Sequence, residues 1–189
     1  MVRIIVKAMP SRQPYIDYLR KYLPQAEFCM DQGKGAFDTF LRALKMAGTE
    51  PCIHMEEDVI LTDGFYNKIH EIIAKKPNNF IQFFSMRQKD LTEGSRWDNN
   101  FLMNQCWYAP MFYSEKMLKY AMGWYLKNGK IHPTGTDTMV CDWLKSRKEK
   151  YWIHCPSLVD HRIGKSAIDP RRSSKRQSLT FRNGIYDDL

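Results

Sequence analysis

The chain has 189 residues, 43% of them hydrophobic and 26% charged, and a formal net charge of +8. This length suits one domain with a sizeable core. Because the sequence has neither a run of about 18 apolar residues nor a signal peptide, we expect a soluble, cytoplasmic protein without a transmembrane segment. The five cysteines are widely spaced and include no Cys-x-x-Cys pair, which argues against a disulfide framework and a zinc ribbon.

The order of strands and helices predicts an α/β fold. Apolar runs predict strands at 3–8, 26–30 and 52–55, and apolar residues at helical spacing predict helices at 12–23 and 36–47. This alternation favours a single domain with a mostly parallel central sheet flanked by helices. Further along we predict a helix at 65–75, a strand at 80–84, an apolar segment at 105–113, a helix at 114–126, a helix near 137 and a strand at 151–155. Residues 85–100 are expected to form a mobile loop over the site, with a plain surface loop as the alternative. The domain is expected to span 1–168, followed by an irregular, basic and exposed segment at 169–189.

Three consecutive acids, Glu56, Glu57 and Asp58, separate the apolar runs 52–55 and 59–61. This pattern predicts a buried strand that emerges at an edge of the sheet, where open α/β sheets bind ligands. Because Glu56 and Asp58 are two residues apart, an extended backbone would point both to one side, and two such oxygen ligands suit Mg²⁺ or Mn²⁺. The alternative is a solvated acidic cluster at the start of the next helix.

The stretch His-Met-Glu-Glu-Asp-Val-Ile-Leu-Thr-Asp at 54–63 resembles the aspartate-rich metal motif of GT-A-fold (Rossmann-like) glycosyltransferases. Within that fold it is similar to the "leucine, glutamate, aspartate, aspartate, valine" block of the lipooligosaccharide glycosyltransferase family. The resemblance implies that Glu56 and Asp58 hold a divalent cation, Mn²⁺ or Mg²⁺, which bridges the diphosphate of a nucleotide sugar. Glu57, which the resemblance places in the nucleotide-sugar site, stands where relatives more often have aspartate.

A second block, His161-x-x-Gly164-Lys165, follows a Pro-Ser-Leu-Val segment. It resembles the C-terminal block of GT-A transferases, which implies that His161 is a further metal ligand and that Gly164 and Lys165 reach the diphosphate. A lone histidine is otherwise more often a structural residue. A neutral imidazole completes an oxygen-rich manganese site well.

The first two strand ends supply the remaining donor-site candidates. The loop at 8–12, with Ala8, Pro10 and Arg12, is expected to line the pocket. The resemblance also places Asp31, at the end of the second strand, near the nucleoside, although a role as a turn or cap residue is an equal alternative. The sequence Gly-Lys-Gly at 33–35 has the spacing of neither a P-loop nor a dinucleotide fingerprint.

Asp137 follows Thr-Gly-Thr at the start of a predicted helix. The resemblance to inverting GT-A enzymes implies that Asp137 is the general base that deprotonates the acceptor hydroxyl. The alternative is an acid stabilised by the helix dipole. Asp142, five residues further along, ranks second.

The acceptor is predicted from charge. Seven of the 21 residues at 162–182 are basic and one is acidic, and the predicted loop at 85–100 adds Arg87, Arg96 and Trp97. UDP-glucose is the expected donor, because it is the commonest donor for the GT-A fold that the sequence resembles. The small size and this basic segment resemble compact phage-encoded glycosyltransferases that modify hydroxymethylated bases in DNA, which implies DNA as acceptor and the host cytoplasm as location. Arg171 and Arg172 would then also contact the acceptor. A cell-surface glycan acceptor, a metal-dependent nuclease and a non-catalytic nucleic-acid-binding protein remain alternatives.

Overall fold

The computed structural model describes residues 2–100, 105–129, 135–164, 173 and 176–187. Three of the sequence-predicted site residues, Lys165, Arg171 and Arg172, lie outside these ranges. No helix within them is both long and apolar enough to cross a bilayer.

A seven-stranded mixed sheet forms the centre of the molecule, in the order β2-β1-β3-β7-β5-β8-β6. Five strands run in one direction, and β6 and β7 run in the opposite direction. The predicted α/β class and mostly parallel sheet are therefore confirmed. The strands are β1 (Arg3–Ala8), β2 (Glu27–Met30), β3 (Cys52–Glu56), β5 (Ile81–Gln82), β6 (Arg96–Asp98), β7 (Cys106–Ala109) and β8 (Tyr151–Ile153).

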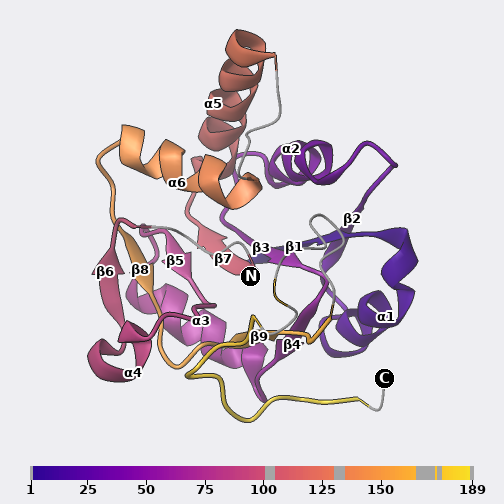
Figure 1. Cartoon of the computed structure of the whole chain (residues 1–189), viewed down its shortest axis with the longest axis vertical. Helices are drawn as coiled ribbons and strands as arrows, with labels where there is room; N and C mark the ends of the chain where they lie inside the picture. The colour runs from indigo at the N-terminus through magenta and orange to yellow at the C-terminus, as the bar shows by residue number, and fades with distance from the viewer. Residues whose placement is uncertain (1, 101–104, 130–134, 165–172, 174–175, 188–189) are drawn as a thin grey trace.

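Helices cover both faces of the sheet (Figure 1). Helices α1 (Gln13–Tyr22) and α3 (Phe65–Lys75) pack on one face in one apolar cluster, and α2 (Ala36–Ala47), α5 (Tyr113–Asn128) and α6 (Thr136–Ser146) lie on the other face. Two shorter helices, η1 (Pro10–Arg12) and α4 (Lys89–Glu93), lie in connections.

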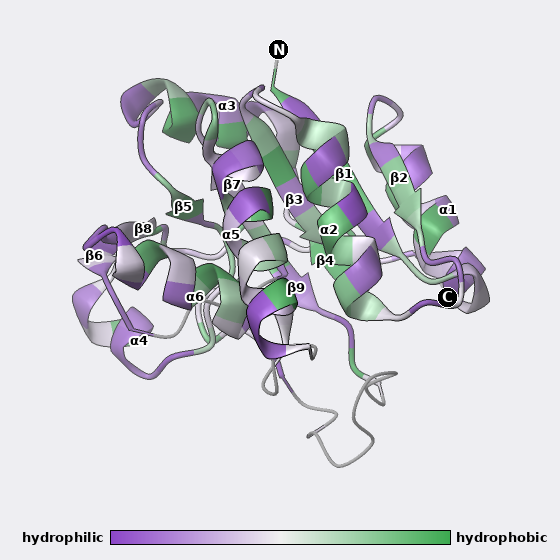
Figure 2. Cartoon of the chain, turned by 90° about the horizontal axis from the view of Figure 1, so that it is seen from above, coloured by the Kyte–Doolittle hydropathy of each residue, from purple (hydrophilic) through white to green (hydrophobic). Residues whose placement is uncertain are grey.

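The alternation of side chains along β1 explains how both layers are held. Ile4 and Val6 belong to the cluster beneath α1 and α3, whereas Ile5 packs towards α2. Lys7 shares the α2 side and is only 4% exposed, so a charged group is buried where the pattern expects an apolar one. Figure 2 shows many hydrophobic residues along β1 and β3, hydrophobic and hydrophilic residues in turn along α2, and mostly hydrophilic residues around α4 and β6.

The chain leaves the central sheet directly after β3. The apolar residues that follow form β4 (Val59–Leu61), which pairs antiparallel with β9 (Val159–His161) in a separate two-stranded sheet. The sequence predicted one strand emerging into a helix. The structure instead places Glu57 and Asp58 at the junction between two sheets. The register of β4 and β9 puts Val59 opposite His161.

Residues 85–100 were expected to form a mobile loop, and this expectation is wrong. They contain helix α4 and the edge strand β6, which pairs with β8. The segment 176–187 at the C-terminus also packs onto the domain. The amide of Ile185 donates to the Leu61 carbonyl at 2.8 Å, and the Tyr18 hydroxyl donates to the Ile185 carbonyl at 2.9 Å.

Candidate functional site

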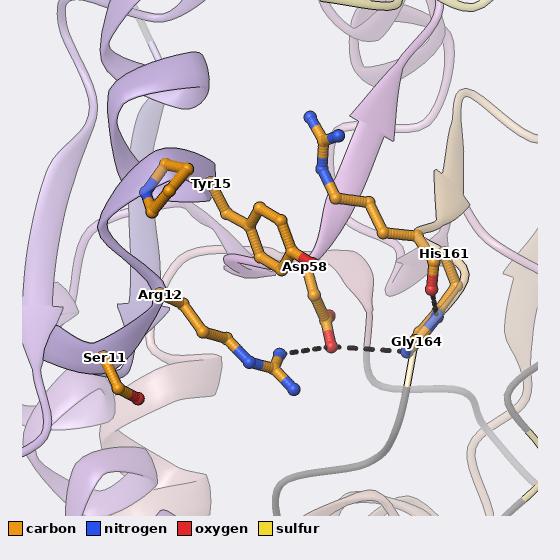
Figure 3. A pocket seen from close by; sticks show the side chains of 8 residues that line it. Ser11, Arg12, Tyr15, Asp58, His161 and Gly164 are labelled. Carbon is orange, nitrogen blue, oxygen red and sulfur yellow. Dashed lines mark hydrogen bonds and ion pairs between the residues drawn. The ribbon is translucent and has the colours of Figure 1, made fainter. Parts of the chain in front are cut away.

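A pocket of about 240 Å³ lies where three distant segments of the chain meet (Figure 3). The first segment is η1 with the start of α1, the second is the junction between β3 and β4, and the third follows β9. Two sequence motifs, the acid stretch and the histidine block, therefore contribute to one cavity. The lining residues are Ser11, Arg12, Pro14, Tyr15, Asp58, His161, Arg162 and Gly164.

The pairing of β4 with β9 brings Asp58 and His161 together. The backbone amide of Arg162 donates to the Asp58 carbonyl at 2.9 Å. This hydrogen bond holds the segment before β4 next to the segment after β9. As a result, Asp58 Oδ2 lies 3.3 Å from His161 Nε2. Both side chains are largely buried, with 14% of the Asp58 side chain and 3% of the His161 side chain exposed.

The hydrogen bond of Nδ1, the other ring nitrogen of His161, determines whether Nε2 carries a proton in the neutral ring. Nδ1 lies 2.6 Å from the carbonyl oxygen of Arg162, and because a carbonyl can only accept, Nδ1 must carry the proton. In the neutral imidazole, Nε2 then presents a lone pair towards the Asp58 carboxylate. Metal-binding histidines have this arrangement, with one ring nitrogen anchored on a backbone carbonyl and the other free for the ion. In the imidazolium form, Nε2 would instead donate to Asp58.

Arg12 supplies positive charge to the same acids. Its Nη1 atom donates to Glu57 Oε1 at 3.0 Å and to Asp58 Oδ2 at 2.6 Å. The guanidinium also lies 5.8 Å from the centre of the Tyr15 ring. Arg12, predicted to contact the donor, therefore lines the pocket and bridges the two acids.

The two neighbouring acids titrate far apart. Burial raises the pKa of Glu57 to about 7, and the charges of Glu56 and Asp58 add to this increase. Burial would also raise the pKa of Asp58. The imidazolium form of His161, which donates a hydrogen bond from Nε2, and the Arg12 guanidinium outweigh this effect and lower that pKa to about 2. A buried site that separates the pKa values of adjacent carboxyls is characteristic of functional clusters.

Glu56 points to a different partner. The Lys7 ammonium lies 2.8 Å from Glu56 Oε1 and above the rings of Phe40 and Trp107, at 5.6 and 5.9 Å from their centres. Burial raises the pKa of Glu56, Lys7 opposes that increase, and the charges of Asp58 and Asp137 contribute to it.

Asp137 is therefore close enough to the acid stretch for its charge to act on Glu56. It lies in the first turn of α6, and its Oδ1 atom accepts a hydrogen bond from the Thr138 amide at 3.1 Å. That placement agrees with an acid at a helix start, whereas Asp137 does not line the described pocket and its role as a base stays a prediction.

The other residues predicted for the donor are placed less directly. Asp31 Oδ1 accepts from the amides of Gly33, Lys34 and Gly35 at 3.0, 3.2 and 3.3 Å, so its carboxylate already fills the concavity that a phosphate would use. This favours the turn role for Asp31. Ala8 is buried and Pro10 is exposed, and neither lines the pocket.

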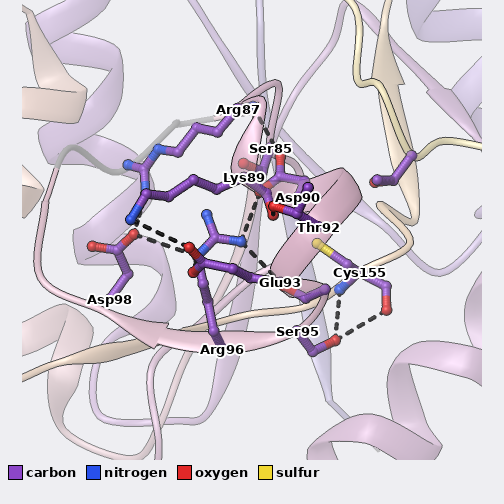
Figure 4. A network of polar contacts seen from close by, with 12 residues as sticks. Ser85, Arg87, Lys89, Asp90, Thr92, Glu93, Ser95, Arg96, Asp98 and Cys155 are labelled. Atoms are coloured by element: carbon purple, nitrogen blue, oxygen red, sulfur yellow. Dashed lines mark hydrogen bonds and ion pairs between the residues drawn. The ribbon is translucent and has the colours of Figure 1, made fainter.

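The three described residues that were predicted for the acceptor, Arg87, Arg96 and Trp97, lie around α4 and the edge strand β6. Arg87 Nη1 donates to Asp98 Oδ2 and Arg96 Nη1 donates to Asp90 Oδ1, so both guanidinium groups are held in a network around α4 and β6 (Figure 4). Trp97 lies 5.3 Å from Trp152 between ring centres. None of the three lines the described pocket.

Three pocket residues, Pro14, Tyr15 and Arg162, were not predicted as functional. The Arg162 guanidinium lies 4.4 Å from the Tyr18 ring centre and 5.0 Å from that of Tyr15, and its Nε and Nη2 atoms have no hydrogen-bond partner among the described residues. Burial lowers the pKa of Arg162. Nothing in the sequence distinguished Tyr15 from an ordinary residue on a helix face. Arg162 could have been predicted, because it is a basic residue directly after His161.

No three His, Cys, Asp or Glu side chains in the described ranges converge as a complete metal site. Asp58 and His161 nevertheless fit a divalent cation that arrives with phosphate, because Mg²⁺ sites commonly use one or two protein ligands together with waters and substrate phosphates. The anchored Nδ1 of His161 supports this fit. Glu56, paired with Lys7, is turned to another partner.

No protein-family model and no curated protein matches the chain. Among the solved structures that match is the crystal structure of A197 from STIV, with a TM-score of 0.53 and 12% sequence identity. The match covers 100% of this chain and 99% of that one. At this identity the similarity establishes a shared fold and no more.

Proposed function

We propose that the protein is a GT-A glycosyltransferase that moves a sugar from a nucleoside diphosphate sugar, with UDP-glucose as the donor, to an acceptor hydroxyl. The observation that carries this proposal is the Asp58–His161 pair, with Nδ1 of His161 anchored on a carbonyl, at the wall of a pocket that also contains Arg12 and Arg162. Carboxylate, imidazole and guanidinium groups so arranged suit a diphosphate and its cation.

The size of the pocket matches part of this donor. At about 240 Å³ it is smaller than the roughly 300–1,000 Å³ that is typical of ligand pockets. The charged diphosphate would therefore occupy the pocket, and the nucleoside and sugar would extend past its rim.

The residues divide the work as follows. Asp58 and His161 would hold a divalent cation, Mn²⁺ or Mg²⁺, and Arg12 and Arg162 would neutralise the phosphate charge that remains. When bound, the cation supplies positive charge that stabilises the leaving diphosphate. Asp137 would accept the proton of the attacking hydroxyl, so the reaction would invert the anomeric centre.

The acceptor follows from charge alone. A net charge of +8 favours a polyanion, and the hydroxymethylated bases of DNA offer both the phosphates and the hydroxyl. A cell-surface glycan is the other acceptor class to be assayed.

Calorimetry tests the donor site directly. UDP and UDP-glucose are titrated with and without Mn²⁺ into the wild type, Asp58→Ala and, as a matched control, Asp17→Ala, whose exposed carboxylate lies on α1. We expect binding that depends on Mn²⁺ in the wild type and in the control, and a loss of at least about 100-fold in Asp58→Ala, which is about 2.7 kcal/mol. If the wild type binds neither nucleotide with Mn²⁺, the transferase proposal fails and the nuclease and nucleic-acid-binding alternatives take precedence.

A further inference from the structure

Arg12 occupies the place at the acid stretch that a metal cation would require. Its Nη1 atom is shared between Glu57 Oε1 and Asp58 Oδ2, at 3.0 and 2.6 Å. Asp58 Oδ2 is also the oxygen that faces His161 Nε2 at 3.3 Å. The same carboxylate oxygen therefore serves the guanidinium and the candidate metal position (Figure 3).

These contacts make the two cations competitors. A cation held between Asp58 and His161 would place a divalent charge next to the positive guanidinium, which like-charge repulsion disfavours. The side chains of Arg12, Glu57 and Asp58 are 18%, 6% and 14% exposed, so solvent screens this repulsion only weakly. Arg12 must therefore withdraw from Asp58 before the cation can take that oxygen.

The pocket offers Arg12 a second partner. Arg12 itself lines the cavity, and it extends from η1, the short helix that precedes α1. A phosphate group in the cavity would accept two parallel hydrogen bonds from the guanidinium, a geometry that arginine forms readily. Arginine thus has one position on the acids and another on a bound anion.

We propose that Arg12 competes with the divalent cation for the acids. The guanidinium stays bonded to Glu57 and Asp58 until a nucleoside diphosphate binds it instead, so that cation and diphosphate bind cooperatively. This inference rests on the donor site proposed above. It assigns Arg12 a positioning role that goes beyond contact with the donor, because Arg12 also makes binding of the cation depend on binding of the diphosphate. Cation bound without diphosphate is disfavoured by Arg12, and each ligand strengthens binding of the other by the same factor.

The test measures binding of Mn²⁺ itself, by electron paramagnetic resonance of the free ion, with and without UDP. The variants are Arg12→Gln and, as a control, Arg20→Gln, which removes one positive charge from α1 at a side chain that is 54% exposed. We expect UDP to strengthen Mn²⁺ binding by about 10-fold or more in the wild type and in Arg20→Gln. In Arg12→Gln, Mn²⁺ alone should bind about 10-fold more tightly than in the wild type, and the effect of UDP should shrink to about 2-fold.

The outcomes separate the two proposals. If Arg12→Gln binds Mn²⁺ alone no more tightly than Arg20→Gln while the wild type still binds Mn²⁺ together with UDP, the competitor role is overturned and the donor site stands. If the wild type does not bind Mn²⁺ even with UDP, the donor site itself is refuted. Should Arg12→Gln fail to fold, as judged by circular dichroism, Glu57→Gln weakens the hold on Arg12 from the other side, and unchanged binding of Mn²⁺ alone in that variant would equally overturn the role.

Discussion

Two clusters of charged side chains, one at the edge strand β6 and one where the chain leaves the inner strand β3, differ in how completely their charges are neutralised. Around α4 and β6, three cations pair with three anions: Arg87 with Asp98, Arg96 with Asp90 and Glu93, and Lys89 with Glu93. At the junction of β3 and β4, three acids at 56–58 share two cations, Lys7 and Arg12. Only the second cluster borders the described pocket of about 240 Å³.

We interpret the first cluster as one that stabilises the fold and the second as the proposed ligand site. Paired charges at the edge leave nothing for a further ion to neutralise, and they tie a short helix to an edge strand (Figure 4). Excess acid beside a cavity leaves a buried negative charge. Burial raises the pKa of Glu57 to about 7, and the charges of Glu56 and Asp58 add to that increase. A cation from outside the protein would relieve that charge.

The largest expected effect is on stability, from a substitution of Asp98 in the edge cluster. Its carboxylate is 9% exposed, pairs with Arg87, and accepts hydrogen bonds from the amides of Asn99 and Asn100 at 2.7 Å each. We expect Asp98→Asn to lower the free energy of unfolding in urea by about 3 kcal/mol, because it leaves a buried guanidinium without its carboxylate. Binding of UDP with Mn²⁺ should stay within about 2-fold of the wild type. A change confined to UDP binding, with stability intact, would show that the edge cluster belongs to the ligand site.

The pH dependence of stability examines the pocket cluster. The pKa of Glu57 in the folded protein is about 7 against 4.5 as its ordinary value, so between these two values the folded state retains a proton that the unfolded state has released. The free energy of unfolding of the metal-free protein should therefore fall as the pH rises through this window. Asp58 acts in the opposite sense, since its lowered pKa gives stability that is present above 3.8 and lost as the pH falls towards about 2.

We expect Glu57→Gln to remove most of the decline between about pH 4.5 and pH 7, an effect of about 1–3 kcal/mol, because one pKa unit corresponds to about 1.4 kcal/mol. Urea unfolding at a series of pH values measures it, and Glu71→Gln, a change on α3, is the control. An identical decline in wild type and Glu57→Gln would contradict the raised pKa.

Periodicity and motif order predicted much of the frame. The strands β1, β2 and β3 and the helices between them follow from long apolar runs and helical spacing, and the structure confirms them. The prediction that Asp58 and His161 lie near the same site agrees with their 3.3 Å contact. Their proximity was inferred from the family resemblance, since more than 100 residues separate them along the chain.

Short elements and charge partners could not be predicted. Strands β4 and β9 have three residues each, which is too few for a period to be recognised, and together they create the junction that places Asp58 against His161. The tertiary fold determines with which acidic side chain each basic side chain pairs. Lys7 lies in β1 and Arg12 follows it by five residues. Lys7 pairs with Glu56 within the sheet, and Arg12 pairs with Glu57 and Asp58 just after β3 ends.

The smallest expected effect concerns Trp97. Its side chain lies on the opposite face of β6 from Arg96 and Asp98, because residues alternate along a strand, and it contacts Trp152 and Lys76. With 43% of its surface exposed, Trp97→Ala should cost about 1 kcal/mol in urea unfolding and leave UDP binding unchanged. Trp97→Phe, which keeps an aromatic ring, is the matched variant and should recover most of that loss. A rise in KM for a DNA acceptor with kcat unaffected would instead mean that the acceptor reaches from the pocket to this edge, and the division between a structural edge and a functional pocket would then fail.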